Sequence, residues 1–372
     1  METTAASVGT IDNGPAVPGL PGLGASAVVG VPFTALTPLR TQQPVYDDPV
    51  RALVAPSPDP AIAAHVLATT AGYAYGDALT VSTMATRLGL ERNRVRTVDE
   101  TVDAMFIRST AHVVQSACGR VVVLAYRGTE PTNLVSWLTD GDTDPEIQGA
   151  DDTEADPLLA HVHAGFYRNV RATRFHVAQV LLDALEGRAI AGGGTVVHRA
   201  EALYFTGHSL GGAMALIHAV LLARDADNGF WRARRLWDLL RGVYTFGAPM
   251  AGDRSFAEQC AALGVTERVR RHVYRNDPVP ALPPWFVGSS YRHVGAAHHL
   301  GGGWTPATLL EGPASLVPLL LSPVAFAARQ IGLLRDVPFV YSLGAHAPQH
   351  YIAALAPPHT TEFGRPAGAR PR

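Results

Sequence analysis

Lysine is absent from this chain of 372 residues, so all 30 of its basic residues are arginine. Together with 36 glycines and abundant alanine, this absence indicates the codon bias of a GC-rich genome. The arginines face 32 acidic residues, which leaves a formal net charge of −2. Because so balanced a chain lacks the positive charge that attracts nucleic acid, we expect no nucleic-acid partner.

Cysteine is nearly absent as well. Cys118 and Cys260 are too few for a disulfide framework, and the sequence leaves open whether they are reduced and buried or form one bridge. The neighbouring His298 and His299 have no cysteine or carboxylate at the spacing of a zinc site. We therefore expect no metal at these histidines. We also expect that the protein needs no organic cofactor.

A long uninterrupted hydrophobic run is also missing. The stretch 315–334 is apolar, but Pro318 and Pro323 break it and Arg329 adds a charge, whereas a spanning helix needs about 20 predominantly apolar residues. We therefore expect no transmembrane segment. Three interpretations of residues 315–334 stay open: core packing, a cap over an active site, or an interfacial patch that docks on lipid. Residues 131–138 are a second candidate cap.

No leader peptide is recognisable at the amino end. Glu2 stands where a signal peptide carries positive charge, and prolines and glycines interrupt any apolar core, which favours a cytoplasmic location. Residues 1–45 are rich in proline and predict a disordered or loosely packed segment, and residues 357–372 predict a disordered tail. We expect residues 46–356 to form one domain with an apolar insertion at about 301–340.

The most informative feature that the chain does contain is the pentapeptide GHSLG at residues 207–211. The apolar residues 202–206 predict a strand before it, and the small apolar residues from 210 to about 223 predict a helix after it. On such a turn, glycines two residues before and after the serine avoid collisions with the strand and helix. Ser209 is therefore a candidate nucleophile. The backbone N–H of Leu210, at the helix N-terminus, points at negative charge that forms beside it.

Strands and helices alternate along the rest of the chain. This alternation favours an α/β protein with a mostly parallel central sheet and helices on both faces. A G-x-S-x-G turn between a strand and a helix is typical of the α/β-hydrolase fold, which is therefore the fold that we expect. The expected elements include two helices within 60–90 that separate near Asp77, strands at 104–109, 112–116 and 121–126, and an amphipathic helix at 169–185.

A serine nucleophile needs an acid and a histidine, which follow it along the chain in this fold. Residues 269–275 predict a strand, and Asp277 comes just after it, where open α/β sheets carry their working residues. The competing Asp253 follows the strand 243–246 and is more typical of a surface turn or a helix start. We therefore favour Asp277 as the acid.

The base must be a histidine beyond Asp277. His346 and His350 flank a loop before a short helical stretch at 351–355. A histidine on a loop can reach the serine while the acid orients it. We favour His346, keep His350 as the alternative, and expect the imidazole within hydrogen-bond reach of Ser209.

Five segments of the chain form an ordered set of motifs: 121–140 (VVVLAYRGTEPTNLVSWLTD), 163–167 (HAGFY), 206–214 (TGHSLGGAM), 244–252 (YTFGAPMAG) and 276–284 (NDPVPALPP). In order and spacing they resemble the motifs of the class 3 lipase family. The resemblance implies that Ser209 is the nucleophile and Asp277 the catalytic acid. It also implies that Thr129 supplies the second oxyanion donor beside Leu210.

The chain departs from the family pattern at three positions. Ala345 precedes His346 where the family often has aspartate, although Tyr351 follows at a spacing close to that of the family. Ala248 and Met250 replace a more usual glutamine and arginine, which alters packing or pocket lining and leaves the triad untouched.

The function that we expect is that of a serine esterase of lipase type, which hydrolyses carboxylic esters of lipids, of the acylglycerol type, through an acyl-enzyme on Ser209. The expected partner is a lipid or other ester substrate. Whether the protein meets this substrate at a membrane or droplet surface stays open. The alternatives are a phospholipase A1 or an acyltransferase with the same triad, or a catalytically inactive lipid-binding relative.

Overall fold

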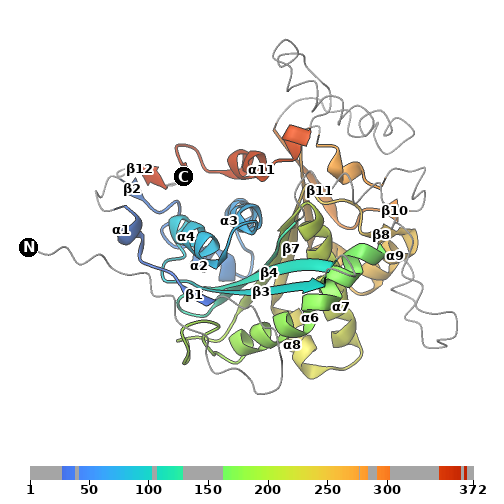
Figure 1. The fold of residues 1–372 in the computed structure, drawn as a ribbon, viewed down its shortest axis with the longest axis horizontal. Coiled ribbons are helices and arrows are strands. Elements are labelled where there is room, and N and C mark those ends of the chain that lie inside the picture. Colours follow the sequence, from blue (N-terminus) through green and yellow to red (C-terminus); the bar gives the residue numbers. More distant parts are fainter. Residues whose placement is uncertain are drawn as a thin grey trace, which may run out of the picture.

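An eight-stranded sheet forms the centre of the computed structural model (Figure 1). The structure describes residues 27–37, 42–102, 107–128, 162–275, 277–283, 291–301, 343–361 and 364–366. In spatial order the strands are β1 (Ala27–Val29), β3 (Arg94–Val102), β4 (Ile107–Gln115), β5 (Val121–Tyr126), β6 (Ala202–His208), β7 (Leu240–Phe246), β9 (Val269–Tyr274) and β11 (Ala296–Leu300).

The sheet is antiparallel at one end and parallel over the rest. β1, β3, β4 and β5 pair antiparallel, and every pair from β5 through β6, β7 and β9 to β11 is parallel. The prediction of an α/β-hydrolase fold with a mostly parallel sheet is therefore confirmed.

Helices cover both faces of the sheet, as Figure 1 shows. The parallel strands succeed one another in one direction, so right-handed crossovers place all of their connecting helices on the same face. These are α6 (Ala164–Leu185), α7 (Leu210–Asp227), α8 (Trp231–Leu239) and α9 (Arg254–Ala262). The other face is covered by α2 (Pro49–Val54), α3 (Pro60–Tyr73), α4 (Ala78–Leu88) and α11 (Pro348–Leu355), which come from the two ends of the chain.

β5 is apolar along its whole length because both faces of the sheet are covered there. Its side chains alternate, with Val122 and Leu124 in the core under α6 and α7, and Val121 and Val123 in the core under α3. A strand that is covered on both faces buries every residue, and full burial of a valine or leucine side chain contributes about 1.5–3 kcal/mol. This burial holds β5 and β6 in the middle of the sheet, and Ser209 follows directly after β6.

Aspartates cap the N-termini of four described helices, beginning with Asp48 at α2. The carboxylates of Asp59, Asp77 and Asp253 accept hydrogen bonds from backbone N–H groups in the first turns of α3, α4 and α9, at 2.8–3.3 Å. Such caps satisfy N–H groups that have no partner within the helix. The break near Asp77 lies where the sequence predicts it, and Asp253 is a helix-start residue as expected.

The first strands differ from the prediction. β3 (Arg94–Val102) is a strand that the sequence pattern does not predict. The described parts of the strands expected at 104–109 and 112–116 belong to one strand, β4. The arginines and acids of β3 hide its strand character, and its position depends on antiparallel pairing with β4 over nine residue pairs. Such a pairing is a tertiary feature that local pattern does not carry.

Both ends of the chain also differ from the prediction where they are described. Within the segment expected to be loosely packed, β1 joins the main sheet and Phe33 is buried. In the expected tail, β12 (Arg365–Pro366) pairs with β2 (Gln42–Gln43), and Arg365 donates a hydrogen bond to the carbonyl of Pro44 at 3.0 Å. Most of the expected insertion at 301–340 lies outside the described residues.

Candidate active site

Ser209 occupies a strained turn between β6 and α7. Its φ of 58° and ψ of −133° lie in a region that residues other than glycine rarely adopt, and Ser209 is fully buried. Its backbone N–H donates to the carbonyl of Phe246 at 2.9 Å, which ties the turn to the end of β7. Non-glycine residues in such conformations cost of order 1–3 kcal/mol and cluster at functional sites.

Two glycines make this turn possible. A Cβ on Gly207 would lie 2.2 Å from the backbone of Gly211, and a Cβ on Gly211 would lie 2.3 Å from the carbonyl oxygen of Tyr126. These distances are far below van der Waals contact, so a side chain at either position would force the strand and helix apart. The structure therefore explains why this motif needs glycine at both positions, as the sequence predicts.

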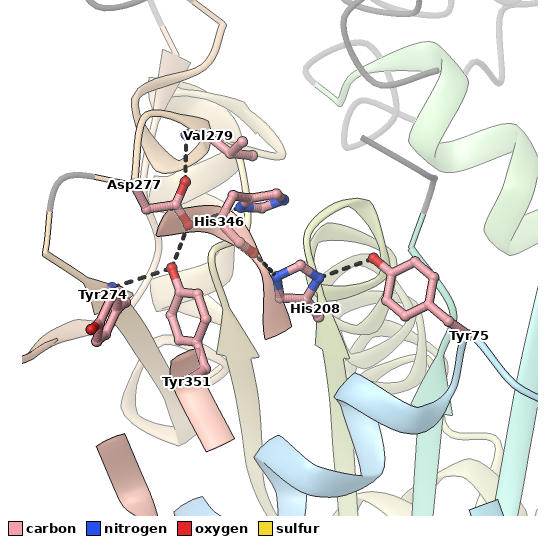
Figure 2. Close-up of polar contacts among 7 residues, drawn as sticks. All are labelled: Tyr75, His208, Tyr274, Asp277, Val279, His346 and Tyr351. Atoms are coloured by element: carbon pink, nitrogen blue, oxygen red, sulfur yellow. Dashed lines mark hydrogen bonds and ion pairs between the residues drawn. The ribbon is translucent and has the colours of Figure 1, made fainter. Parts of the chain in front are cut away.

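Asp277 lies three residues beyond β9 and is buried. Its Oδ1 accepts a hydrogen bond from the Val279 N–H at 2.9 Å (Figure 2). Its Oδ2 accepts from Nδ1 of His346 at 2.8 Å and from the Tyr351 hydroxyl. A buried carboxylate with three donors is held in one orientation.

The structure brings His346, and not His350, to Asp277. His346 ends a 3₁₀ turn (Leu343–His346) just before α11, and its side chain is buried. The ring of His350 instead stacks on Tyr274 with centroids 5.2 Å apart, and it lines a pocket of about 580 Å³ between α3, α4 and α11.

Two atoms of this cluster have no partner among the described residues: the Oγ of Ser209 and Nε2 of His346, both buried. They do not hydrogen-bond to each other, so the expected contact is not formed in this structure. Buried polar atoms almost always have a partner, and catalytic hydrogen bonds are often long before substrate binds. The arrangement thus offers a hydroxyl and an imidazole nitrogen to a reacting group.

The role of the Tyr351 hydroxyl was missed at the sequence level. Burial, followed by the nearby charge of Asp277, raises the pKa of Tyr351 well above its ordinary value. The phenol therefore stays protonated and donates to the carboxylate. In the sequence, this role of Tyr351 is indicated only by its position five residues after His346.

The expected oxyanion donors are described in part. The N–H of Leu210 is the first of α7, where backbone N–H groups have no partner within the helix. Thr129 lies outside the described residues, as do both candidate caps, residues 131–138 and 315–334.

The sequence also raises questions about disulfides, metal sites and membrane-spanning helices, which the described residues address in part. Cys118 and Cys260 are free thiols. Within the described ranges, histidine, cysteine and acidic side chains form no group of three or more that could hold a metal. No helix there is long and apolar enough to cross a membrane.

Comparisons with known proteins point in one direction. Residues 123–287 match the family described as lipase (class 3). The chain is 29% identical over 203 residues to triacylglycerol lipase OBL1 of Arabidopsis thaliana, which covers 47% of this chain and 36% of that protein. It is 28% identical over 211 residues to a lipase of Rhizopus niveus, which covers 55% of this chain and 44% of that protein. The chain thus spans less than half the length of these curated relatives.

One solved structure was compared with the chain. The native Rhizomucor miehei lipase–propeptide complex superposes with a TM-score of 0.47 at 20% identity, over 73% of this chain and 85% of that one.

Proposed function

We propose, from the premise that this chain belongs to the class 3 lipase family, that it is a serine esterase of lipase type that hydrolyses carboxylic esters of acylglycerol-type lipids. One observation carries the proposal: the strained Ser209 lies at the end of β6, close to a buried His346–Asp277 pair, and both Ser209 Oγ and His346 Nε2 have no partner among the described residues.

The reaction follows from these positions. Ser209 Oγ attacks the ester carbonyl carbon while its proton passes to Nε2 of His346. Asp277 accepts from Nδ1–H, which holds the imidazole in the tautomer with a free Nε2 and stabilises the imidazolium that forms. The imidazolium then protonates the leaving alcohol. Water, which gives its proton to the same nitrogen, releases the acid from the acyl-serine.

The negative oxygen of the tetrahedral intermediate needs donors. The N–H of Leu210 at the start of α7 supplies one, and the N–H of Thr129 supplies the second in this proposal. Gly128, the residue before Thr129, lies against the turn: a Cβ there would be 2.6 Å from the carbonyl oxygen of His208. The chain after β5 is therefore brought to the nucleophile.

The substrate in this proposal is a lipid ester at a membrane or droplet surface. Acylglycerols with long chains are almost insoluble in water, so the enzyme meets them at an interface. The phospholipase A1 and acyltransferase alternatives use the same triad and differ only in head group or acceptor.

A fluorophosphonate probe tests the nucleophile, because it reacts only with an activated serine. We expect it to label the wild-type protein on Ser209, and we expect Ser209→Ala to lose labelling and about 10⁴-fold or more of ester hydrolysis. Ser82→Ala is the matched control, since the Ser82 hydroxyl is also buried without a partner among the described residues but lies on α4. The control should keep full activity.

The outcomes separate the alternatives. An unlabelled wild-type protein would favour the inactive lipid-binding relative. A labelled protein that cleaves phosphatidylcholine and leaves acylglycerols intact would be a phospholipase A1. A series of p-nitrophenyl esters of increasing chain length then defines the acyl preference.

A further inference from the structure

A second histidine lies beside the candidate base. His208 is the residue before Ser209, and it is buried at the end of β6. Its Nε2 lies 2.6 Å from the main-chain carbonyl oxygen of His346, and its Nδ1 lies 3.0 Å from the hydroxyl of Tyr75 (Figure 2). The two imidazole rings are 4.5 Å apart between centroids.

These partners define the proton positions on His208. A carbonyl oxygen can only accept, so Nε2 of His208 carries the hydrogen. Nδ1 of the neutral ring is then an acceptor, and the Tyr75 hydroxyl donates to it. Burial, followed by the nearby His346, lowers the pKa of His208 well below its ordinary value, so the ring stays neutral.

The environment distinguishes the two adjacent imidazoles. His346 faces the carboxylate of Asp277, which stabilises an imidazolium. His208 faces a hydroxyl and a carbonyl, and its two nitrogens are both engaged. A proton taken from Ser209 therefore stays on His346 rather than passing to its neighbour.

The same contacts hold His346 at two points. Nδ1–H of its side chain donates a hydrogen bond to Asp277, and its main-chain carbonyl accepts one from Nε2–H of His208. The second bond ties the turn that carries the base directly to the turn that carries the nucleophile. This connection matters because the two segments are 138 residues apart in the chain and no strand pairing joins them.

Tyr75 extends the connection to a third segment. It follows α3, and a Cβ on Gly128 would lie 2.3 Å from its hydroxyl oxygen. The hydroxyl therefore packs against the backbone just before Thr129, the proposed oxyanion donor. One phenol thus contacts the chain after β5 while its hydrogen bond orients His208.

We propose that Tyr75 and His208 are positioning residues that set the distance and orientation of His346 relative to Ser209. The inference rests on the proposed esterase function for its kinetic test, and it adds two residues that act through His346. A shift of about 1 Å at a catalytic group can cost roughly 10²-fold in rate, so such positioning is measurable.

The test uses variants of the full chain and a short soluble ester, p-nitrophenyl butyrate. Tyr75→Phe removes the hydroxyl, His208→Leu removes both ring contacts, and His208→Gln keeps an N–H donor that can reach the His346 carbonyl. Tyr46→Phe is the matched control. The Tyr46 hydroxyl lies 2.9 Å from Nδ1 of the buried His65, so it makes the same kind of pair with α3 instead of with the turn at Ser209.

We expect kcat to fall about 10-fold in Tyr75→Phe, which corresponds to one lost hydrogen bond. His208→Leu should lose roughly 10²-fold or more, with KM changed less than about 3-fold, and His208→Gln should recover part of that loss. Tyr46→Phe should lose similar thermal stability and keep kcat. Equal losses of kcat in Tyr75→Phe and Tyr46→Phe would overturn the proposal.

Histidine-labelled protein studied by ¹⁵N NMR gives a readout that needs no activity. We expect His208 to stay neutral, with its proton on Nε2, at a pH where an exposed imidazole is already protonated, because burial lowers its pKa. We also expect the hydrogen-bonded Nδ1–H resonance of His346 to broaden in His208→Leu. A wild-type protein that neither labels nor hydrolyses would defeat the esterase proposal alone. An unchanged His346 resonance in His208→Leu would then overturn the positioning role.

Discussion

Gly247 leaves just enough room for the acid and the base to meet. It has a φ of +61°, and a Cβ there would lie 2.7 Å from Oδ2 of Asp277 and 3.0 Å from Nδ1 of His346. A methyl group would therefore enter the space between the two bonded groups. The glycine of the YTFG segment is explained by this contact as well as by its backbone conformation.

Gly247→Ala should separate this steric effect from backbone strain. We expect a loss of roughly 10³–10⁴-fold in kcat/KM, because the imidazole loses its orienting carboxylate. Gly264→Ala is the control: Gly264 has a φ of +69°, but its Cβ would meet no described atom within 4 Å. Both variants should lose about 1–2 kcal/mol of unfolding free energy to the positive φ. Similar activity in the two purified variants would contradict the steric argument.

At the scale of elements, the short helix α11 places two functional groups. His346 precedes it, and Tyr351 within it donates to Asp277. Its position depends on α3, since a Cβ on Gly72 would lie 2.8 Å from the Cδ1 of Ile352. The close approach of the two helices therefore brings the end of the chain to the site.

The pairing of β12 with β2 is a second link between distant elements. The Arg365 guanidinium is buried, donates to the Pro44 carbonyl and forms an ion pair with Asp47. We expect Arg365→Ala to lower the free energy of unfolding by about 1–3 kcal/mol in urea titrations. Arg254→Ala, which removes an exposed pair with Glu258, should cost less than about 0.5 kcal/mol. Equally small losses would show that the buried contacts of the Arg365 side chain add nothing to stability.

At the scale of the whole molecule, buried neutral histidines make stability depend on pH. Burial lowers the pKa of His65, His112 and His272 to about 4 and that of His218 to about 3. Above about pH 6.5 these rings are neutral in both the folded and the unfolded chain. As the pH falls from about 6.5 toward 4, only the unfolded chain binds protons at these rings, so unfolding becomes easier.

We therefore expect the free energy of unfolding to fall by up to about 1.4 kcal/mol per pH unit for each of these histidines between about pH 6 and 4.5. Denaturant titrations at several pH values measure the slope. His65→Gln should reduce the slope by about one proton. A flat profile between pH 6.5 and 4.5 would contradict the argument.

Much of the central fold could be derived from the chain alone. The strand, turn and helix around Ser209 follow from steric limits within five residues, and the helix break at Asp77 follows from a local cap. The choice of Asp277 follows from its place just after the strand β9. These features depend on short-range geometry, which a sequence pattern records directly.

The other features depended on packing between distant segments. The choice of His346 over His350 comes from how α11 lies against α3 and β9, and the role of Tyr75 comes from contact with a residue 133 positions later. β3 is a strand because β4 pairs with it. Such contacts involve groups whose sequence neighbours carry no sign of them, since burial and hydrogen-bond partners are set when the chain closes on itself.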